Sequence, residues 1–357
     1  MRPAFCYLFL LALLAPARVF AGSSSECFWD EALSRAAASL VSKGARPDSE
    51  VLLQAARDAG SDAVGLHALW LLEFDDEAVN RWLRKIGTTA DAPLACGDAR
   101  DHKSRLVIAA ARAGSLAAFD SQSRVIRGWL SPTFTDPELV VSFNSGEIRR
   151  YRIHPNMLET GITLAADLPA PIIVQLVAHG PAGPRPVAQR VVTFGDGKPS
   201  ARETARREQS NVVLTTDEAT GESTAVSTAQ ELSIQINRIR AKRTMPALRS
   251  NRLIDTAATE HAQSVCNSGR IGHQLRLGDD PETRLARQGV RARLVGEAIA
   301  RSTDPGAAWR ALLRSPSHLS TLLDGRFTDA GIGLARDPGG RSCLIVMLAA
   351  WPRFVGR

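Results

Sequence analysis

The chain has 357 residues, with 44 lysines and arginines against 37 aspartates and glutamates and a formal net charge of +7. This length exceeds what one ordinary hydrophobic core holds, so it predicts two or three domains. The charge excess is mild, and no basic run alternates with aromatic residues, so the sequence argues against a nucleic-acid partner.

Residues 1–21 predict a secretory signal peptide. Arg2 precedes an apolar run from Ala4 to Ala17, and small residues lead into a polar stretch. A membrane-spanning helix needs about 20 apolar residues, and Arg18 interrupts this run too early. We expect cleavage after Ala21, with Ala17 as the second choice. The expected product is a secreted protein, periplasmic or extracellular, without a membrane span.

The cysteines that remain after this cleavage predict disulfides. Cys6 leaves with the signal peptide, whereas Cys27, Cys96, Cys266 and Cys343 stay. An even number of cysteines in an oxidising compartment favours two bridges. Three pairings are possible, and the one that joins Cys27 to Cys96 and Cys266 to Cys343 keeps each bridge inside one predicted region. No cysteine pair has a metal-type spacing, so a cysteine zinc site is not expected.

Residues 22–120 carry the pattern of amphipathic helices. Apolar residues recur at intervals of three and four from Trp29 to Leu40, and a similar stripe begins at Val51. Further stretches of this kind cover 63–74, 77–86 and 103–113. Such spacing places the apolar side chains on one helix face. The region therefore predicts an N-terminal helical bundle of four or five helices.

Residues 121–195 change to the pattern of short strands. Runs rich in β-branched residues cover 124–130, 138–143, 149–153, 172–177 and 187–194. Glycine, proline and asparagine between them are turn signals, at the spacing of a small antiparallel β-sandwich. We expect a structural or docking module. Residues 196–227 then turn polar and predict a linker.

Residues 228–352 mix helices with strands. Helices are expected over 229–242, 250–266, 281–288 and 304–314, and strands over 294–300, 330–335 and 342–349. Ser250 and Asp304 are the expected N-caps of their helices, because their side chains accept hydrogen bonds from the first turn. The whole chain is thus predicted to be a multidomain α+β protein.

Three polar residues in this region have the positions of site residues. His273 follows the end of the helix predicted over 250–266 in a glycine-flanked loop, and His318 follows the end of the helix predicted over 304–314. Glu297 stands in an otherwise apolar strand, where a buried carboxylate needs a cation, a metal or convergent donors. His261 lies on the apolar face of its helix and is expected to belong to the core.

An ordered set of motifs here resembles the CAP superfamily, also called SCP-like, which includes plant pathogenesis-related proteins. The motifs are Asn237-x-x-Arg240, Pro246-x-Leu248, the 257–262 helix, 269–273, Gly296-Glu297, Trp309 to His318, and Phe327 to Gly333. The resemblance implies an α-β-α sandwich with a central antiparallel sheet and a cleft lined by His273, Glu297 and His318. It covers about residues 228–352.

Three positions depart from that family's pattern. Ala298 stands where the Gly-Glu-Asn motif has asparagine, Leu312 where a second cleft glutamate is common, and Leu319 where arginine is frequent. The lost carboxylate removes a spare general base. It therefore favours binding over hydrolysis.

Two imidazoles and one carboxylate can form a zinc-type site with an open position, or an acid–base pair around a water. We expect a secreted binding protein, more probable as a non-enzyme than as an enzyme. Its cleft would take a small molecule, a lipid, a cell-envelope ligand or a divalent cation such as Zn²⁺, with His273 and His318 as the metal ligands.

Three alternatives stay open. One is a metal-dependent hydrolase or peptidase in which Glu297 is catalytic. Another is a satisfied polar cluster in which Glu297 accepts hydrogen bonds from the two histidines and only fixes the loops. The third is a docking protein that acts through its N-terminal domains.

Overall fold

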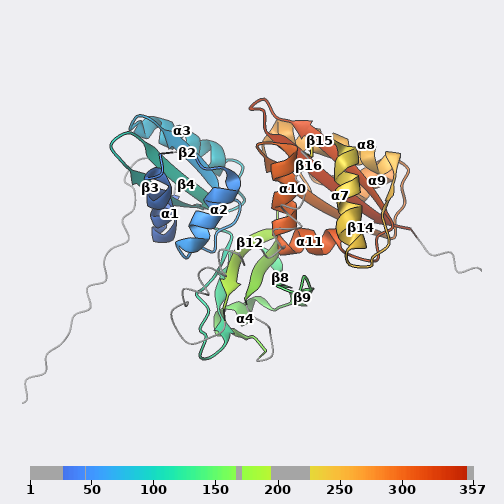
Figure 1. Cartoon of the computed structure of the whole chain (residues 1–357), viewed down its shortest axis with the longest axis horizontal. Helices are drawn as coiled ribbons and strands as arrows, with labels where there is room; N and C mark the ends of the chain where they lie inside the picture. Colours follow the sequence, from blue (N-terminus) through green and yellow to red (C-terminus); the bar gives the residue numbers. More distant parts are fainter. Residues whose placement is uncertain (1–26, 45, 166–170, 194–225, 352–357) are drawn as a thin grey trace, which may run out of the picture.

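The computed structural model describes residues 27–44, 46–165, 171–193 and 226–351. In these ranges the chain forms three modules, which Figure 1 shows as a blue and teal N-terminal module, a green β module beneath it, and a yellow to red C-terminal module. The predicted signal peptide lies outside the described residues, as does all of the predicted linker except 226–227. No helix in the described ranges is long and apolar enough to cross a membrane.

The N-terminal module is a four-stranded sheet with helices on both faces. Its strands are β1 (Cys27–Trp29), β2 (His67–Leu71), β3 (Leu94–Arg100) and β4 (Arg105–Ala111), in the order β1-β3-β4-β2. Helices α1 (Glu31–Val41) and α2 (Ser49–Asp58) share a core with one face of the sheet, and α3 (Asp76–Gly87) shares a core with the other.

The prediction of a helical bundle for this module is wrong. Segments 63–74 and 103–113 contain strands β2 and β4, whereas the helices predicted over 29–40, from Val51 and over 77–86 do form, as α1, α2 and α3. β4 is a central strand with six buried residues in a row, because helices cover both faces of the sheet. Such a strand has a continuous apolar run instead of alternation, and periodicity does not separate it from a helix.

The β module is built on an antiparallel sheet in the order β12-β11-β8-β9. Its strands are β8 (Thr135–Phe143), β9 (Ile148–Arg152), β11 (Ile172–Gly180) and β12 (Gly183–Val192). One face shares a core with helix α4 (Pro155–Thr160) and with two small strand pairs. These pairs are β5 (Gly114–Leu116) with β7 (Gly128–Leu130), and β6 (Val125–Ile126) with β10 (Ile162–Thr163).

The strands predicted between 124 and 194 are therefore present, but the predicted boundary at residue 121 is too late. Ala113 and Leu116 are buried in the core of the β module rather than in that of the N-terminal module. The β module thus begins near residue 113. The sequence pattern predicts a helix over 103–113, which hides the boundary. No long loop marks it either, because β5 begins at Gly114, soon after β4 ends at Ala111.

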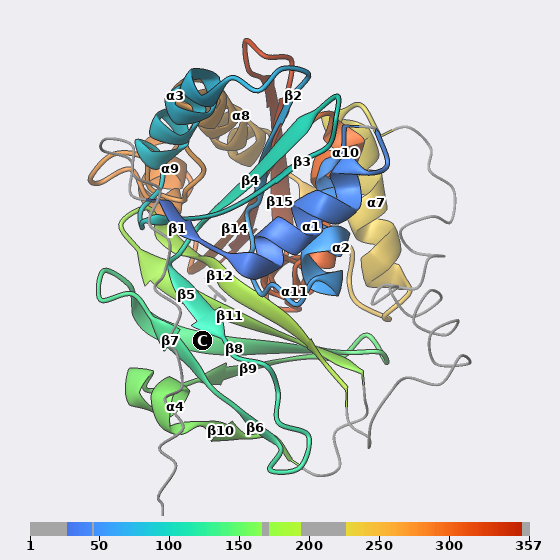
Figure 2. The ribbon, with the colours of Figure 1, turned by 90° about the vertical axis from the view of Figure 1, so that its left-hand side faces the viewer.

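The C-terminal module is an α-β-α sandwich, as predicted. Its sheet has the order β13-β15-β16-β14, with β13 (Arg249–Ser250), β14 (Leu294–Ser302), β15 (Asp329–Arg336) and β16 (Ser342–Ala350). Helices α7 (Ala229–Ala241), α10 (Pro305–Arg314) and α11 (Pro316–Leu322) cover one face, and α8 (Arg252–Ser268) and α9 (Pro281–Arg287) cover the other. Figure 2 shows these two helix layers on opposite sides of the strands. The α+β class is confirmed.

Two local predictions in this module need correction. The N-cap of α8 is Asn251, whose side chain accepts from the Leu253 N–H at 3.1 Å, while Ser250 belongs to β13. A further helix, α11, begins at Pro316, so His318 lies on a helix and not in a loop. Asp304 caps α10 as predicted, accepting from the Ala307 N–H at 2.8 Å.

Both predicted disulfides are present. Cys27 is bonded to Cys96, which ties β1 to β3, and Cys266 is bonded to Cys343, which ties α8 to β16. Each bridge lies within one module.

The Asn237-x-x-Arg240 motif of the C-terminal module binds the backbone of loops and does not line the predicted site. The Asn237 amide donates to the carbonyl of Leu248 at 3.0 Å and accepts from its N–H at 2.8 Å. Arg240 is fully buried and donates to the carbonyls of Pro246 and Leu322, both at 2.9 Å. These backbone acceptors offset the cost of burying the guanidinium. Asn237 and Arg240 therefore fix the connection after α7 and the one after α11.

The β module also contacts the C-terminal module. Gln175, on the face of β11 away from its own core, is 1% exposed and accepts from the Ser317 N–H at 3.0 Å. At the hairpin between β11 and β12, the carbonyl of Ala182 accepts from the Gln274 N–H at 3.0 Å. The hairpin therefore touches the loop that contains His273.

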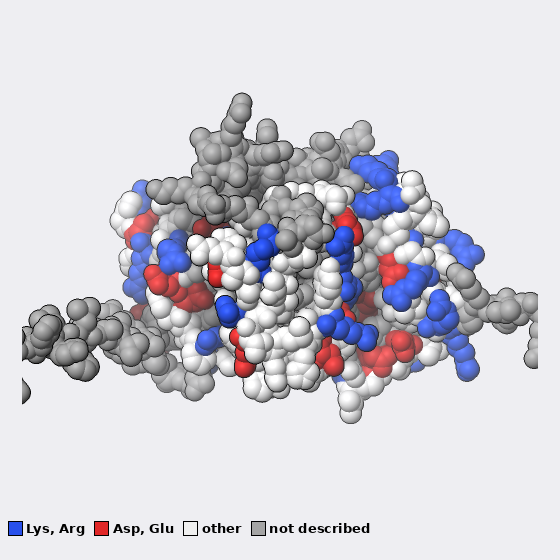
Figure 3. Space-filling view, turned by 90° about the horizontal axis from the view of Figure 1, so that it is seen from below, with Lys and Arg blue, Asp and Glu red and all other residues white. Residues whose placement is uncertain are grey.

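Figure 3 shows the molecule from below, where the β module lies. On this face lysine and arginine side chains are interspersed with aspartate, glutamate and uncharged surface. A continuous basic stripe, which would attract a phosphate backbone, is not formed on the part of this face that is drawn in colour.

Candidate functional site

His273, Glu297 and His318 line one cavity of about 900 Å³, named the cleft below. His273 lies in the loop after α8, Glu297 on β14 and His318 on α11. The structure therefore brings the three predicted site residues together. Their role in binding a ligand stays a prediction.

Two glycines of the family motifs shape this site. Gly269 ends α8 in the left-handed region, with φ of 68°, and so turns the chain toward His273. A Cβ on Gly296 would stand 2.6 Å from the ring of Phe327, so only glycine leaves room for this ring beside β14. The local geometry of the fold therefore explains why each of these two positions has glycine.

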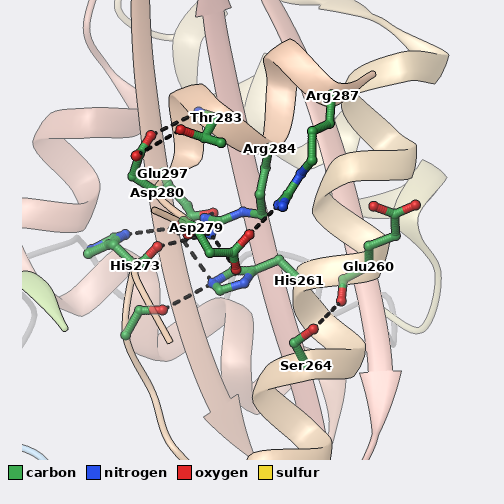
Figure 4. A network of polar contacts seen from close by, with 11 residues as sticks. Glu260, His261, Ser264, His273, Asp279, Asp280, Thr283, Arg284, Arg287 and Glu297 are labelled. Atoms are coloured by element: carbon green, nitrogen blue, oxygen red, sulfur yellow. Dashed lines mark hydrogen bonds and ion pairs between the residues drawn. The ribbon is translucent and has the colours of Figure 1, made fainter. Parts of the chain in front are cut away.

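Glu297 is the centre of a buried polar network, which Figure 4 shows. Its side chain is 1% exposed. One carboxylate oxygen accepts from Nδ1 of His273 at 2.8 Å, and the other accepts from Nη2 of Arg284 at 2.7 Å. Arg284 also donates to the carbonyl of His273 at 3.0 Å. Both oxygens of Glu297 are therefore engaged.

These contacts keep Glu297 ionised. Burial by itself would raise the pKa of this carboxyl, but the hydrogen bond from His273 and the charge of Arg284 hold it below its ordinary value. The expectation that Glu297 needs a cation or convergent donors is met by Arg284, which the sequence analysis missed. The only sequence signal for it is a basic residue in the short helix that precedes β14.

His261 is a core residue, as expected. It is 1% exposed, and its Nε2 lies 3.0 Å from the carbonyl of Gly272. The same nitrogen is 3.8 Å from Glu297. Burial lowers the pKa of His261. A neutral imidazole that donates to Gly272 fixes the loop just before His273.

His318 differs from His273 in its hydrogen bonds. Burial lowers the pKa of His318 to about 3, and the charge of His273 acts in the same direction. Its Nδ1 is buried without a hydrogen-bond partner among the described residues. His318 is therefore a neutral imidazole with an unused nitrogen. His273, in contrast, has its Nδ1 bound to Glu297.

A test of the donor set shows how a metal would fit. The described ranges contain no group of three or more His, Cys, Asp or Glu side chains arranged to hold an ion. Among the three predicted site residues, the donors that remain available are Nε2 of His273 and the imidazole of His318. His273 suits this role, because metal-binding histidines usually donate their other N–H to a carboxylate. Glu297 would orient His273 rather than bind the ion.

One wall of the cleft comes from the β module, which sequence reasoning did not predict. Glu138, Arg150 and His179 line it together with Arg185. Glu138 and Arg150 form an ion pair at 2.6 Å. These residues approach the histidines only through the packing of two modules, so no spacing in the sequence could reveal them.

A three-layer domain with two histidines and one buried glutamate around a cleft defines the class of the C-terminal module. Residues 234–349 match the model of the cysteine-rich secretory protein family, CAP. The C-terminal module is therefore a CAP domain, as the ordered motifs indicated. The match covers about a third of the chain and leaves the two preceding modules unassigned.

The solved structures to which the chain is similar include three bacterial proteins. An outer surface protein from Borrelia burgdorferi is 20% identical, with 39% of this chain and 97% of that chain covered and a TM-score of 0.33. An extracellular protein with an SCP domain from Bacillus anthracis is 17% identical, with 66% and 84% covered and a TM-score of 0.32. A cysteine-rich secretory protein from Staphylococcus aureus is 12% identical, with 57% and 63% covered and a TM-score of 0.29.

Proposed function

We propose that this is an exported protein whose CAP-domain cleft binds a small ligand without turnover, with a divalent cation such as Zn²⁺ as the candidate to test. One observation carries the proposal. Both oxygens of Glu297 are engaged, at 2.8 Å by His273 and at 2.7 Å by Arg284, while Nδ1 of His318 has no partner among the described residues.

The same observation counts against a hydrolase. General-base catalysis needs a group that can take a proton from water within hydrogen-bond reach. Glu297 is the carboxylate of the predicted trio, and its ion pair with Arg284 disfavours protonation. Leu312, at the position where a second glutamate is common in the family, is fully buried in the core. The residues therefore favour binding over turnover.

A cation in the cleft would be held by Nε2 of His273 and by the imidazole of His318. Two protein donors leave the remaining positions of a tetrahedral ion to water or to a second ligand. Metal binding requires the unprotonated imidazole, and burial keeps His318 in that form at neutral pH. A bound cation would supply a Lewis-acid contact for an anionic or carbonyl group of such a ligand.

Export is supported by the disulfides. Two bridges, one in the N-terminal module and one in the CAP domain, are typical of a protein that folds in an oxidising compartment. The amino-terminal sequence predicts the signal peptide that such a route requires. The proposed location is the periplasm or the extracellular space.

Isothermal titration of the purified protein with zinc chloride tests the metal part. We expect binding at micromolar zinc, and binding about tenfold weaker or more in the variant His273→Ala/His318→Ala. His102→Ala is the matched control, because His102 is exposed and lines neither cavity. No binding by the wild type, or equal binding by the double variant, would contradict the proposal. Turnover of a peptide library that disappears in Glu297→Gln would favour the hydrolase instead.

A further inference from the structure

A second cavity, of about 430 Å³, lies where the three modules meet. It is named the intermodule cavity below. Helix α2 of the N-terminal module, strand β12 of the β module and helix α10 of the CAP domain contribute to its walls, and Figure 1 shows these elements converging at the centre of the molecule. Its volume lies within the range of about 300–1,000 Å³ that is common for small-molecule sites.

The charged residues of this cavity are unbalanced. Three carboxylates line it, namely Asp48, Glu50 and Asp304. Six arginines line it as well, namely Arg57, Arg185, Arg270, Arg301, Arg310 and Arg314. The lining therefore carries three more positive charges than negative ones. Two of the carboxylates already cap helices, since Asp48 accepts from the Val51 N–H and Asp304 from the Ala307 N–H, both at 2.8 Å. Glu50 contacts Arg310 and Arg314.

Carboxylates offset the burial of two of these arginines, Arg57 and Arg185, only in part. Burial and the charge of Arg314 together lower the pKa of Arg57 to about 10, and the charge of the neighbouring Asp58 acts against them. On β12, Nε and Nη2 of Arg185 are buried without a hydrogen-bond partner among the described residues, and Asp91 is 3.9 Å away. A buried guanidinium without acceptors costs free energy that an anion would offset.

Two neutral side chains of the same lining have the same deficit. Gln189 is 4% exposed and Ser302 is 5% exposed. Nε2 of Gln189 and Oγ of Ser302 have no hydrogen-bond partner in the described ranges. Buried donors in folded proteins are nearly always paired with protein, water or a ligand. Four unpartnered polar atoms from two modules thus occur around one cavity, in Arg185, Gln189 and Ser302.

Apolar side chains from all three modules also line the cavity. Leu53 and Ile86 come from the N-terminal module, Val187 from the β module, and Ile271 and Ile299 from the CAP domain. An inorganic anion would leave these side chains without a partner. A ligand with an apolar body would cover them, at about 25 cal/mol for each Å² removed from water.

We propose that the intermodule cavity binds an amphiphilic organic anion, with its acidic group among the guanidiniums of the lining and its apolar body against Leu53, Ile86 and Ile299. His273 and His318 line both cavities, whereas Arg57 lines only the intermodule cavity. Arg57 is therefore the residue by which the two sites can be tested separately.

Isothermal titration with decanoate at low ionic strength tests the proposal. Decanoate has one carboxylate on a flexible apolar chain. We expect the purified wild type to bind it, Arg57→Gln to bind it about tenfold more weakly or worse, and Arg57→Lys to retain most of the affinity. Zinc binding should be the same in Arg57→Gln and in the wild type, because Arg57 does not line the cleft.

Three controls complete the design. Arg81→Gln removes an arginine that is 58% exposed and lines neither cavity, and it should bind decanoate like the wild type. Decanol lacks the charge and inorganic phosphate lacks the apolar body, so each should bind about tenfold more weakly than decanoate, or worse. If Arg57→Gln lowers the unfolding midpoint, Arg185→Gln replaces it with the same expectation for decanoate alone, because Arg185 also lines the cleft.

Several results would overturn the proposal. If the wild-type protein does not bind decanoate at millimolar concentration, the proposed site does not exist. Equal affinity of Arg57→Gln, and of Arg185→Gln where it is used, would remove the role of the guanidiniums. Decanol that binds as tightly as decanoate would show a purely apolar site, and phosphate that binds as tightly would show a site for a simple anion.

Discussion

At the scale of single residues, the ion pair between Arg284 and Glu297 decides the character of the cleft. Arg284 is 3% exposed and Glu297 is 8% exposed, so neither charge is well hydrated. Such a pair contributes little in total, but loss of one partner leaves the other charge buried without compensation. The pair is thus a structural requirement for the position of His273.

We predict that Arg284→Met lowers the free energy of unfolding by about 3–5 kcal/mol. The remaining carboxylate would keep only its contacts with His273 and His261. Urea unfolding followed by circular dichroism measures the change. The double variant Arg284→Met/Glu297→Gln should lose less than the two single variants together, because no charge is then left unpaired. Strict additivity would contradict the role assigned to the pair.

At the scale of elements, the contact of α8 with β15 depends on two glycines. A Cβ on Gly333 would stand 2.2 Å from the carbonyl carbon of Ala258, and one on Gly331 would stand 2.3 Å from the N atom of Asp255. The helix therefore lies directly on the backbone of the strand. Any side chain at these positions would push the two elements apart.

Gly333→Ala should destabilise the protein by about 1–3 kcal/mol or more, because the added methyl overlaps with backbone that cannot rotate away. Thermal unfolding of the variant and of the wild type measures this cost. Gly87→Ala is the matched control, since a Cβ there meets no atom within 4 Å. Equal unfolding temperatures for Gly333→Ala and Gly87→Ala would show that α8 moves freely on the sheet.

The elements also show what the sequence could predict. The CAP-domain helices have clear caps and apolar stripes, and their ordered motifs point to three residues that the structure brings together in one cleft. The sequence of strand β4 predicts a helix, because a strand that is buried on both faces does not alternate apolar with polar residues. Helix α11 was missed because Ser315-Pro316 is a stop signal for α10 as well as the start of the next helix.

At the scale of the whole molecule, three histidines that stay neutral in the fold determine its response to acid. Burial lowers the pKa of His67 to about 4 and that of His318 to about 3, and it also lowers the pKa of His261. In the unfolded chain a histidine takes up its proton near pH 6.5. The unfolded state therefore binds more protons than the folded state below that pH.

We predict that the free energy of unfolding falls as the pH drops from about 6.5 towards 4. Each of these histidines contributes at most about 1.4 kcal/mol per pH unit in this window. Urea unfolding at about pH 7.5 and about pH 5 measures the effect, and His318→Gln should reduce the difference between the two. A stability that stays constant down to the range where carboxylates titrate would contradict the prediction.

The contacts between modules are the features of the structure that the sequence did not predict. Gln175 is an ordinary residue of a predicted strand, yet it is buried against Ser315 and Ser317, some 140 residues further along the chain. The arginines of the intermodule cavity are likewise scattered over all three modules. Periodicity and motifs report on one element at a time, so surfaces that meet only after the modules pack were not predicted.

The hairpin of the β module has a practical consequence for work on this protein. Ala182 binds the backbone of Gln274, and a Cβ on Gly183 would stand 2.9 Å from the Cβ of His273. A truncated fragment that begins near residue 226 would expose this loop to solvent and let the imidazole swing. Crystals or ligand screens of such a fragment would therefore describe a looser pocket than the intact chain possesses.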